Sequence, residues 1–386
     1  MSWPLVKLGD AAPAKATKHV FSETEEVWTL NLDQVEAGTG KVIQKIIRPV
    51  SEVGSSTHGF DERHVLYSKL RPYLNKVVLP DGKGLATTEL VPLLPDPERL
   101  DREYLAYYLR SKRFVDWVSA QVAGAKMPRV SMQLFWGHEI PLPPLDDQKR
   151  IATILDKADA IRRKRQQAIH LADEFLRAVF LEMFGDLVTN TKRWEVKPLD
   201  EHLTFLTSGS RGWAKYYSET GSKFIRIQNV SKNKLLLQDM AYVDAPEGAE
   251  ANRTKVQVDD VLLSITADLG RSSVATKDIA GGHINQHLAI LRLSKERLNP
   301  RYLSAYLSSA AGVNQFTRAN KSAVKSGINF TDIRTLEVPL PPMAKQIRYE
   351  KAYDKIMCLQ AEQYRSLDEA KKSFSALSQK AFKGEL

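Results

Sequence analysis

Apolar residues recur at alternating steps of three and four along two stretches of the chain, 145–184 and 343–386. This spacing gathers apolar side chains on one helix face and is typical of helices that pair as coiled coils. The first stripe consists of Leu155, Ala158, Arg162, Arg165, Ile169, Ala172, Leu176, Val179 and Met183. The second consists of Tyr353, Ile356, Gln360, Gln363, Leu367, Ala370, Phe374, Leu377 and Ala381. We predict two long helices that pair with each other; packing of each helix only on its own domain is the alternative.

The second stripe is the first one displaced by a constant offset along the sequence. EIPLPPLDDQ, from Glu139, and EVPLPPMAKQ, from Glu337, share six of ten residues at this same offset of 198. Residues 99–184 superpose on 297–382 without a gap, and HVLYSKL further upstream pairs with DVLLSIT. A register held over this length indicates an internal duplication. If the helices run antiparallel, a pseudo-twofold axis relates the two copies.

Each copy opens with about 140 residues of short β-type runs, turn residues and one short helix, which predicts an α+β domain. The Pro-Leu-Pro-Pro phrase ends this domain, because proline suits the first turn of a helix and not its interior. We predict five segments along the chain. They are a first domain at 1–144, a helix at 145–184, a linker at 185–193, a second domain at 194–342 and a second helix at 343–386.

Composition is that of a folded protein, with 43% apolar and 26% charged residues. A single cysteine, Cys358, excludes an internal disulfide, and no apolar run is long enough to span a membrane. The N-terminus lacks the pattern of a signal peptide, so we expect a cytoplasmic protein. The net charge of +10 suggests a polyanionic partner. The first domain contributes little to that charge, with 18 basic and 17 acidic side chains in residues 1–144.

Three features together resemble the specificity subunit of type I restriction–modification systems. They are the two Pro-Leu-Pro-Pro-x-x-x-Gln phrases, the Met183-Phe-Gly-Asp exit of the first helix, and the Trp-x-x-x-x-Leu openings at Trp3 and Trp194. The resemblance implies two target recognition domains, each reading one half of a bipartite site in double-stranded DNA. It also implies that the two helices form the spacer and dock two methyltransferase subunits, with restriction/translocase subunits joining them.

The resemblance further implies that this chain is not catalytic and carries no cofactor. S-adenosylmethionine, ATP and Mg²⁺ would belong to the partner subunits, and the methyltransferases would flip and methylate adenines. One departure is visible, because the second phrase reads PPMAKQ where the first has an acidic pair, PPLDDQ. The two copies align poorly over residues 11–63 and 202–259. Different readers on one scaffold predict an asymmetric target.

The candidate DNA contacts are mainly basic and amide side chains, because such groups hold phosphates and read base edges. Two pairs of loops that carry them lie at matching places of the two copies, and a further loop, which mixes aromatic and basic residues, is proposed for the second domain alone. In the first domain the candidates are Lys69, Arg71, Asn75, Lys76, Lys126 and Arg129. In the second they are Arg211, Trp213, Lys215, Arg226, Gln228, Asn229, Arg271, Ser272, Lys321 and Lys325. We place Arg226, Gln228 and Asn229 in a β-type run in which alternation directs only some of them outward.

Candidate partner-docking residues come from the repeated phrase and from the polar positions of the helical stripes. They are Pro143, Pro144, Gln148, Arg162 and Arg165 in the first copy, and Pro341, Pro342, Gln346, Gln360 and Gln363 in the second.

Two other classes of protein remain as competitors. One is a structural adaptor whose duplicated domains bind proteins rather than DNA. The other is a Mg²⁺-dependent nuclease using Asp186, Glu195 and Lys197, which imitate an acid and acid-x-Lys arrangement. The aligned first copy has Pro4 in place of Glu195, which argues against catalysis. His283 and His287 fall in a β-type run, where a structural or DNA-facing role is favoured over a metal site.

Overall fold

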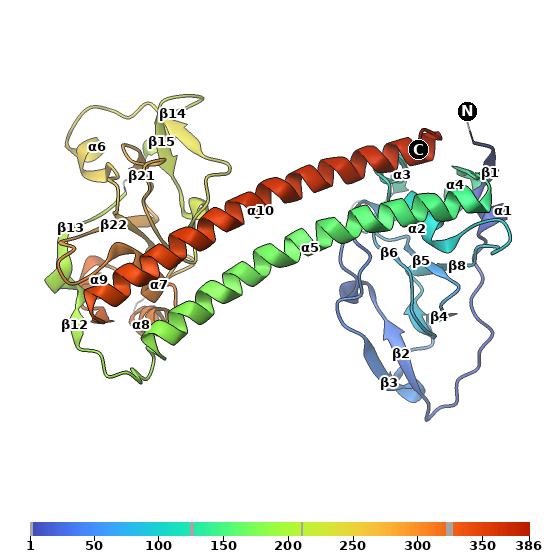
Figure 1. The fold of residues 1–386 in the computed structure, drawn as a ribbon, viewed down its shortest axis with the longest axis horizontal. Helices are drawn as coiled ribbons and strands as arrows, with labels where there is room; N and C mark the ends of the chain where they lie inside the picture. Colours follow the sequence, from blue (N-terminus) through green and yellow to red (C-terminus); the bar gives the residue numbers. More distant parts are fainter. Residues whose placement is uncertain (1–2, 124–126, 210, 322–326) are drawn as a thin grey trace. The chain divides into compact units, whose positions relative to one another are not determined.

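The computed structural model describes residues 3–123, 127–209, 211–321 and 327–386 (Figure 1). The chain forms two compact units: unit 1 comprises 1–168 and 363–386, and unit 2 comprises 169–362. The division runs through both long helices, α5 (Leu145–Phe184) and α10 (Met343–Lys383), so that each unit contains the start of one helix and the end of the other.

Unit 1 is built on two small sheets, one with the strand order β3-β2-β7-β4 and one with the order β6-β5-β8. Its strands are β1 (Leu5–Lys7), β2 (Glu26–Leu30), β3 (Ile46–Pro49), β4 (Thr57–Phe60), β5 (Val65–Ser68), β6 (Val77–Val78), β7 (Gly84–Thr87), β8 (Leu90–Leu93), β9 (Val122–Ala123), β10 (Arg129–Val130) and β11 (Glu139–Pro141). Its shorter helices are α1 (Leu8–Ala11), η1 (Leu32–Gln34), η2 (Val50–Glu52), η3 (Pro72–Leu74), α2 (Arg102–Arg110), α3 (Lys112–Ser119) and α4 (Met132–Gly137).

Unit 2 contains two four-stranded sheets, with the orders β13-β22-β19-β20 and β14-β18-β15-β21. Its strands are β12 (Val196–Pro198), β13 (Leu203–Ser208), β14 (Tyr217–Ser218), β15 (Ser222–Ile225), β16 (Val230–Ser231), β17 (Lys234–Leu235), β18 (Ala241–Val243), β19 (Val261–Ser264), β20 (Ser272–Val274), β21 (His283–Ile284), β22 (Leu288–Leu293) and β23 (Glu337–Pro339). Its shorter helices are η4 (Leu199–His202), η5 (Trp213–Tyr216), η6 (Ile227–Asn229), α6 (Ala249–Thr254), α7 (Pro300–Leu307), α8 (Ala310–Lys321) and α9 (Phe330–Arg334).

The duplication appears as equivalent pairings in the two units. β5 and β19, the predicted VLYS and VLLS strands, are buried along their whole length, as a continuous apolar run in a sheet interior requires. β1 pairs antiparallel with β11, and β12 pairs antiparallel with β23, immediately before each long helix. Asp101 and Asn299, 198 residues apart, cap α2 and α7 by accepting hydrogen bonds from backbone N–H groups. The predicted α+β fold class is confirmed.

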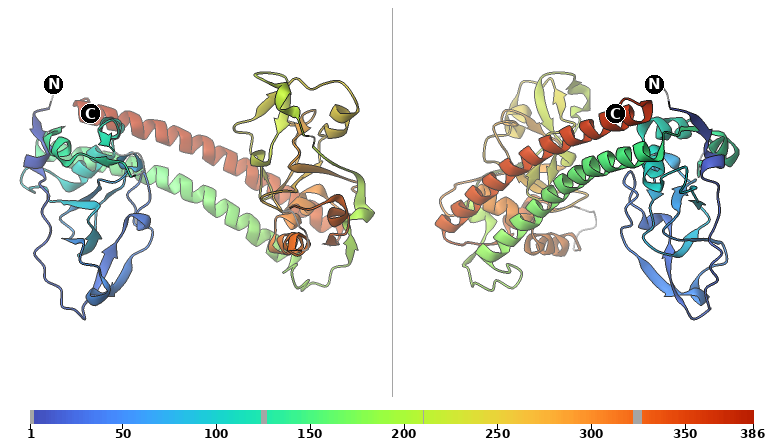
Figure 2. Two further views of the ribbon diagram at one scale, coloured as in Figure 1. Left: turned by 180° about the vertical axis from the view of Figure 1, so that it is seen from behind. Right: turned by 45° about the vertical axis from the view of Figure 1, so that its right-hand side comes forward.

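Segments of the two long helices share the core of each unit and lie side by side there (Figures 1 and 2). In unit 1, Leu155 at the start of α5 lies in the same buried cluster as Phe382 at the end of α10. In unit 2, Tyr353 of α10 shares a cluster with Phe184 of α5. Every residue of the two predicted stripes is buried or half-buried. The stripes are therefore the covered faces of both helices.

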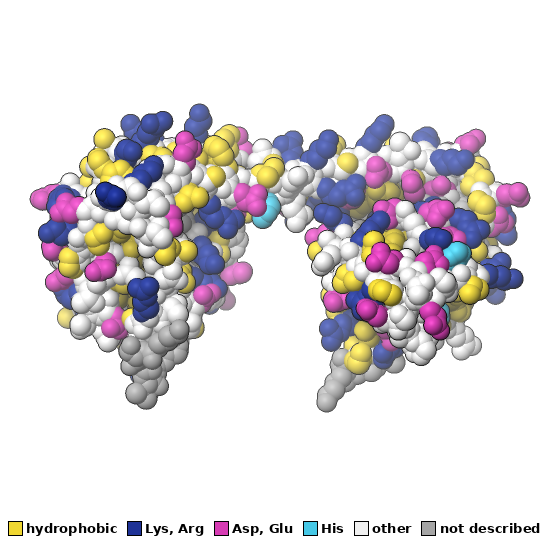
Figure 3. Space-filling model, turned by 90° about the horizontal axis from the view of Figure 1, so that it is seen from below, with side chains coloured by type: hydrophobic (Ala, Val, Ile, Leu, Met, Phe, Trp, Pro, Cys, Tyr) yellow, Lys and Arg dark blue, Asp and Glu magenta, His cyan; other side chains and the backbone are white. Residues whose placement is uncertain are grey.

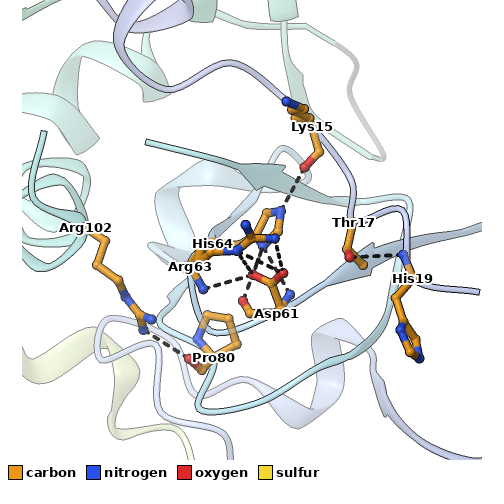
Figure 4. Close-up of polar contacts among 8 residues, drawn as sticks. All are labelled: Lys15, Thr17, His19, Asp61, Arg63, His64, Pro80 and Arg102. Atoms are coloured by element: carbon orange, nitrogen blue, oxygen red, sulfur yellow. Dashed lines mark hydrogen bonds and ion pairs between the residues drawn. The ribbon is translucent and has the colours of Figure 1, made fainter. Parts of the chain in front are cut away.

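The turn before β5 is held by a buried histidine (Figure 4). The His64 ring lies 2.9 Å from the Asp61 carboxylate and 2.8 Å from the Lys15 carbonyl oxygen. Hydrogen bonds from Arg63, at 2.6 Å for Nη2, hold the pKa of Asp61 down to about 2. In unit 2 the equivalent turn is held by Asp260, which accepts from the Gln257 backbone N–H and pairs with Arg292. The equivalent turns of the two units are thus held by different side chains.

The helices in the described ranges of the chain were compared with the requirements for a membrane span. None of these helices combines the length and the apolar character that crossing a bilayer requires.

Candidate nucleic-acid interface

Three loop segments of unit 1 that are far apart in sequence meet at the end of β5. The Lys69 backbone N–H donates to the Glu89 carbonyl at 3.0 Å, and the Val130 N–H donates to the Lys69 carbonyl at 3.1 Å. Arg71 N–H donates to the Pro128 carbonyl at 2.8 Å, and Leu70 bridges to Arg129. The two predicted DNA loops of the first domain are therefore adjacent parts of one surface.

The same backbone arrangement recurs at the end of β19 in unit 2. Ile265 N–H donates to the His287 carbonyl at 3.0 Å, and Ile328 N–H donates to the Ile265 carbonyl at 3.0 Å. These residues lie 196 to 198 positions after Lys69, Glu89 and Val130. We call the side chains at these two places the strand-end clusters. They are Lys69, Glu89 and Arg129 in unit 1, and Thr266, Gln286 and His287 in unit 2.

The unit 1 strand-end cluster is charged. Arg129 donates from Nε and Nη2 to the Glu89 carboxylate, at 3.1 and 2.8 Å. These hydrogen bonds lower the pKa of Glu89, with a further contribution from the charge of Lys69. Burial and the positive charge of Lys69 also lower the pKa of neighbouring His58. The cluster therefore contains the Arg129 guanidinium, which is oriented by the Glu89 carboxylate, and the nearby charge of Lys69.

The unit 2 strand-end cluster consists of hydroxyl, amide and imidazole groups. The His287 ring Nδ1 lies 2.6 Å from the Thr266 hydroxyl, and its Nε2 lies 3.1 Å from the Gln286 amide nitrogen. The amide nitrogen can only donate, so Nε2 accepts in this hydrogen bond, and Nδ1 faces the Thr266 hydroxyl. All three side chains are half-buried. The predicted DNA contacts included neither Glu89 nor Gln286; the 198-residue offset aligns Glu89 with His287 but aligns Gln286 with Thr88.

Several predicted DNA contacts are solvent-accessible and carry positive charge. Arg71, Arg211 and Lys215 are exposed, and Lys69 is half-exposed. Arg271 is half-exposed and forms an ion pair with Asp268. On the face drawn in Figure 3, Lys and Arg side chains are interspersed with Asp and Glu rather than gathered in one basic patch. Contact with a polyanion on that face would depend on particular side chains.

Three predicted contacts are wrong for this conformation, because their side chains are buried inside unit 2. Trp213 is 3% exposed and stacks on Phe224. Asn229 is fully buried and accepts from the Arg226 backbone N–H, since the expected strand is interrupted there by the 3₁₀ turn η6. Ser272 is fully buried and donates to the Ser304 carbonyl at 2.7 Å. These side chains support loops and do not reach a groove.

Three further candidates combine partial exposure with internal contacts, and a fourth is exposed. Asn75 Nδ2 donates to the Arg110 carbonyl at 3.0 Å, and Lys76 Nζ donates to the Leu32 carbonyl at 2.6 Å. Arg226 donates to the Asp239 carbonyl, whereas Gln228 is exposed. The internal hydrogen bonds of Asn75, Lys76 and Arg226 use donors that DNA would otherwise take.

The remaining DNA candidates cannot be placed. Lys126 and Lys325 lie outside the described residues. Lys321 ends α8, and its side chain is not among those described.

The glutamine of each repeated phrase is an internal latch rather than an exposed docking group. Gln148 accepts from the Asp101 N–H at 2.8 Å and donates to the carbonyls of Arg99 and Pro143 at 2.8 and 2.7 Å. Gln346 makes the same three bonds in unit 2, with Asn299, Arg297 and Pro341. Both glutamine side chains are fully buried, so direct docking through them is wrong. The glutamines bind the start of each long helix to the N-cap of the short helix before it.

The other docking candidates differ in accessibility. Pro144 and Pro342 are exposed, whereas Pro143 and Pro341 are buried. In unit 1, Arg165 donates to the Gln363 side chain at 3.2 Å, and Arg162 lies over the Phe374 ring and pairs with Asp159. In unit 2, Gln360 is buried and donates to the Ile169 carbonyl and to Asp173. The polar stripe positions thus have partners within their own units.

The nuclease candidate residues have ordinary structural partners. Asp186 accepts hydrogen bonds from the Val188 N–H and the Thr189 hydroxyl, which lower the pKa of its carboxyl. Glu195 pairs with Arg297, and this hydrogen bond lowers the pKa of Glu195. Within the described ranges, no group of three or more His, Cys, Asp or Glu side chains lies together in a way that could hold a metal ion.

Comparison with known proteins decides the family. The sequence model described as "Type I restriction modification DNA specificity domain" matches residues 60–171 and 191–356, one segment in each half of the chain. The chain belongs to the type I restriction modification DNA specificity domain family. The predicted family is confirmed, and its two matched segments agree with the internal duplication.

Individual relatives are distant but cover most of the chain. The MjaVIII specificity subunit of Methanocaldococcus jannaschii is 23% identical over 319 residues, covering 76% of this chain and 73% of the relative. The EcoBI specificity subunit of Escherichia coli is 21% identical over 314 residues, covering 72% of this chain and 65% of the relative. A substantial part of each relative therefore lies outside the match.

The fold is similar to that of a solved type I restriction–modification system S subunit from M. genitalium. That chain is 14% identical, the superposition covers 98% of this chain and 96% of that one, and the TM-score is 0.61. The family description supports the predicted DNA sequence recognition and does not favour the protein-binding adaptor. The relatives named here are specificity subunits, in agreement with the prediction of a non-catalytic chain.

Proposed function

We propose that this chain is the DNA specificity subunit of a type I restriction–modification complex. Each unit binds one half of an asymmetric bipartite site in double-stranded DNA. The chain positions two methyltransferase subunits there, and restriction/translocase subunits join that complex. S-adenosylmethionine, ATP and Mg²⁺ belong to those partners, and the complex acts in the cytoplasm. The family match and the specificity-subunit relatives support this proposal.

One observation carries most of the weight: the backbone scaffold is repeated in the two units, whereas the side chains of the strand-end clusters on it are not. The Gln148 and Gln346 latches make the same three hydrogen bonds in their own units. The backbone bonds around Lys69 and Ile265 also match. A repeated scaffold with carboxylate, lysine and arginine groups on one copy and hydroxyl, amide and imidazole groups on the other suits recognition of two different half-sites.

The proposal includes the predicted segments, with target recognition domains at 1–144 and 194–342, helices at 145–184 and 343–386, and a linker at 185–193. The helices pair as an antiparallel coiled coil about a pseudo-twofold axis and set the spacer between half-sites. The hydrogen bond from Arg165 to Gln363 supports this, because the two residues are 198 positions apart and therefore equivalent in the two copies. Equivalent residues contact each other where a twofold axis passes.

Docking of the methyltransferase subunits is assigned to the accessible residues of the repeated phrase and helices. Pro144 and Pro342 are exposed at the start of each long helix, and Arg162 and Arg165 are half-exposed. The exposed acidic Asp146 in the first phrase has Ala344 as its counterpart in the second, so the two docking sites differ in charge.

Charge reversal at the accessible basic candidates tests DNA binding by the assembled complex. The variant carries Glu at four positions: Lys69, Arg71, Arg211 and Lys215. Its binding to DNA that the wild-type complex methylates is measured at several salt concentrations. We expect binding to weaken by at least ~10³-fold, because lost phosphate contacts reduce counterion release. The same four-fold reversal at Lys112, Arg113, Lys277 and Lys295, all exposed and outside the candidate DNA and docking residues, is the matched control. Unchanged DNA binding in the first variant, with partner assembly intact, would favour the protein-binding adaptor instead.

A further inference from the structure

The strand-end clusters share a backbone and differ in chemistry, and this combination allows each to be matched to a base. In both units the cluster is fixed by backbone hydrogen bonds between the strand end, the following inter-strand turn and the segment before the long helix. This rigidity matters because base reading needs side chains held in a defined direction. Neither cluster contributes to a hydrophobic core cluster of its unit.

In unit 1 the orientation of the Arg129 guanidinium is set by Glu89. The carboxylate occupies the Nε and Nη2 edge of the guanidinium, at 3.1 and 2.8 Å. Among the described residues, the Arg129 side chain has no other hydrogen bond or ion pair, so its Nη1 and Nη2 edge is available. Its side chain is 43% exposed. Two parallel donors on a fixed plane match the O6 and N7 acceptors of guanine.

In unit 2 the orientation of Gln286 is set by His287. One amide N–H of Gln286 donates to the ring Nε2 at 3.1 Å, and Nδ1 of the ring faces the Thr266 hydroxyl at 2.6 Å. This leaves the second amide N–H and the amide oxygen of Gln286. One donor beside one acceptor on a planar amide matches the N7 acceptor and N6 amino donor of adenine.

We propose that the strand-end clusters are the base-reading elements, with Arg129 reading a guanine in one half-site and Gln286 reading an adenine in the other. This inference rests on the proposed function and adds the residues and the bases. Glu89 and His287 are positioning residues, because each acts through the neighbouring side chain that it orients. The clusters occupy equivalent places on the duplicated scaffold, but their reading residues come from different segments, since Arg129 aligns with Gly327 and Gln286 with Thr88.

The test maps methylated bases in DNA modified by the full complex carrying variant specificity subunits. Arg129→Ala is expected to reduce discrimination for guanine at one position of one half-site by on the order of 10- to 100-fold. The other half-site should be unchanged. Gln286→Ala should relax one adenine position in the opposite half-site only. Exposed Lys112, which pairs with Asp116 on α3, supplies the control Lys112→Ala, expected to leave the motif intact.

Two conservative variants separate base reading from charge and from loss of folding. Arg129→Lys keeps the charge but lacks the planar fork, so guanine discrimination should fall while the salt dependence of binding is retained. Glu89→Gln should relax the same guanine position partially, because orientation of the guanidinium is weakened.

An unchanged motif in the Arg129 and Gln286 variants of an active complex would overturn the inference and leave the proposed function standing. Uniform weakening at all positions, as a phosphate contact gives, would also overturn it. A wild-type complex that methylates without any bipartite motif would instead contradict the proposed function itself.

Discussion

The glutamine latches are alike in the two copies of the duplicated unit, whereas the strand-end clusters differ in their side chains. At the latches, Gln148 and Gln346 keep the same residue type, the same burial and the same three hydrogen-bonded partners. At the clusters only the backbone hydrogen bonds are the same in the two units. The side chains differ, because unit 1 has Lys69, Glu89 and Arg129 where unit 2 has Thr266, Gln286 and His287. The two copies therefore share the junction between the short helix and the long helix, whereas the side chains at their strand ends differ.

The largest expected effect concerns the aromatic ends of the long helices. Phe184→Ala and Phe382→Ala should each destabilise their own unit by about 3–5 kcal/mol, because each removes a buried ring. Phe184 packs on Tyr302 and Phe382 on Tyr104, with ring centroids 4.7 and 5.4 Å apart. Urea unfolding measures the two losses. Exposed Phe175→Ala is the control, expected to change stability little. A large loss in one unit with none in the other would break the equivalence.

The latches themselves should give the next largest effect. Gln148→Leu and Gln346→Leu each leave one buried N–H and two carbonyls without their partner, which costs about 2–3 kcal/mol. The losses in unfolding free energy of the two variants should agree within about 1 kcal/mol, because the two glutamines make the same hydrogen bonds. Exposed Gln379→Leu on α10 serves as the comparison. Variants that unfold no earlier than wild type would show that the latch is not structural.

The support of the turn before β5 gives a smaller, pH-dependent effect that is specific to unit 1. The pKa of Asp61 is lowered to about 2, so its ionised form stabilises the folded state above the unfolded pKa of about 4. That stabilisation is lost as pH falls from about 4 toward about 2. Asp61→Asn should cost ~1 kcal/mol at neutral pH, since Arg63 is largely exposed.

Unfolding free energies of Asp61→Asn and wild type, measured from pH 7 down to pH 2, check this expectation. The gap between the two proteins should close in the acid range. Glu62→Gln, a change at an exposed neighbour, is the control. A gap independent of pH would contradict the assignment.

The smallest effect should come from the hydrogen bond between Arg165 of α5 and Gln363 of α10. Arg165→Ala or Gln363→Ala removes one half-exposed hydrogen bond of 3.2 Å and should cost about 0.5–1 kcal/mol. The double variant should cost less than the sum of the two single variants, because both remove the same bond. Strict additivity in this double-mutant cycle would show that the two side chains do not interact in solution.

Much of the fold could be predicted from the sequence because its signals are local or periodic. The three-and-four spacing defined the covered faces of α5 and α10, and the apolar runs defined β5 and β19. The site was harder, since side-chain direction depends on tertiary packing. Trp213 looked like an exposed aromatic beside glycines but stacks on Phe224 in the core.

Non-local pairing accounts for the rest of what sequence reasoning missed. Lys69, Glu89 and Arg129 come from three separate segments and meet only through backbone hydrogen bonds. Gln148 looked available for a partner because it is polar and follows two prolines. Its internal use appears only once Asp101, 47 residues earlier, is placed beside it.

Mapping the methylated bases in DNA modified by the complete wild-type complex tests the central claim most directly. A duplicated scaffold with different side chains on its two strand-end clusters predicts one motif with two unlike half-sites, separated by a non-specific spacer of fixed length. A single continuous motif, or two identical half-sites in a palindrome, would contradict the account.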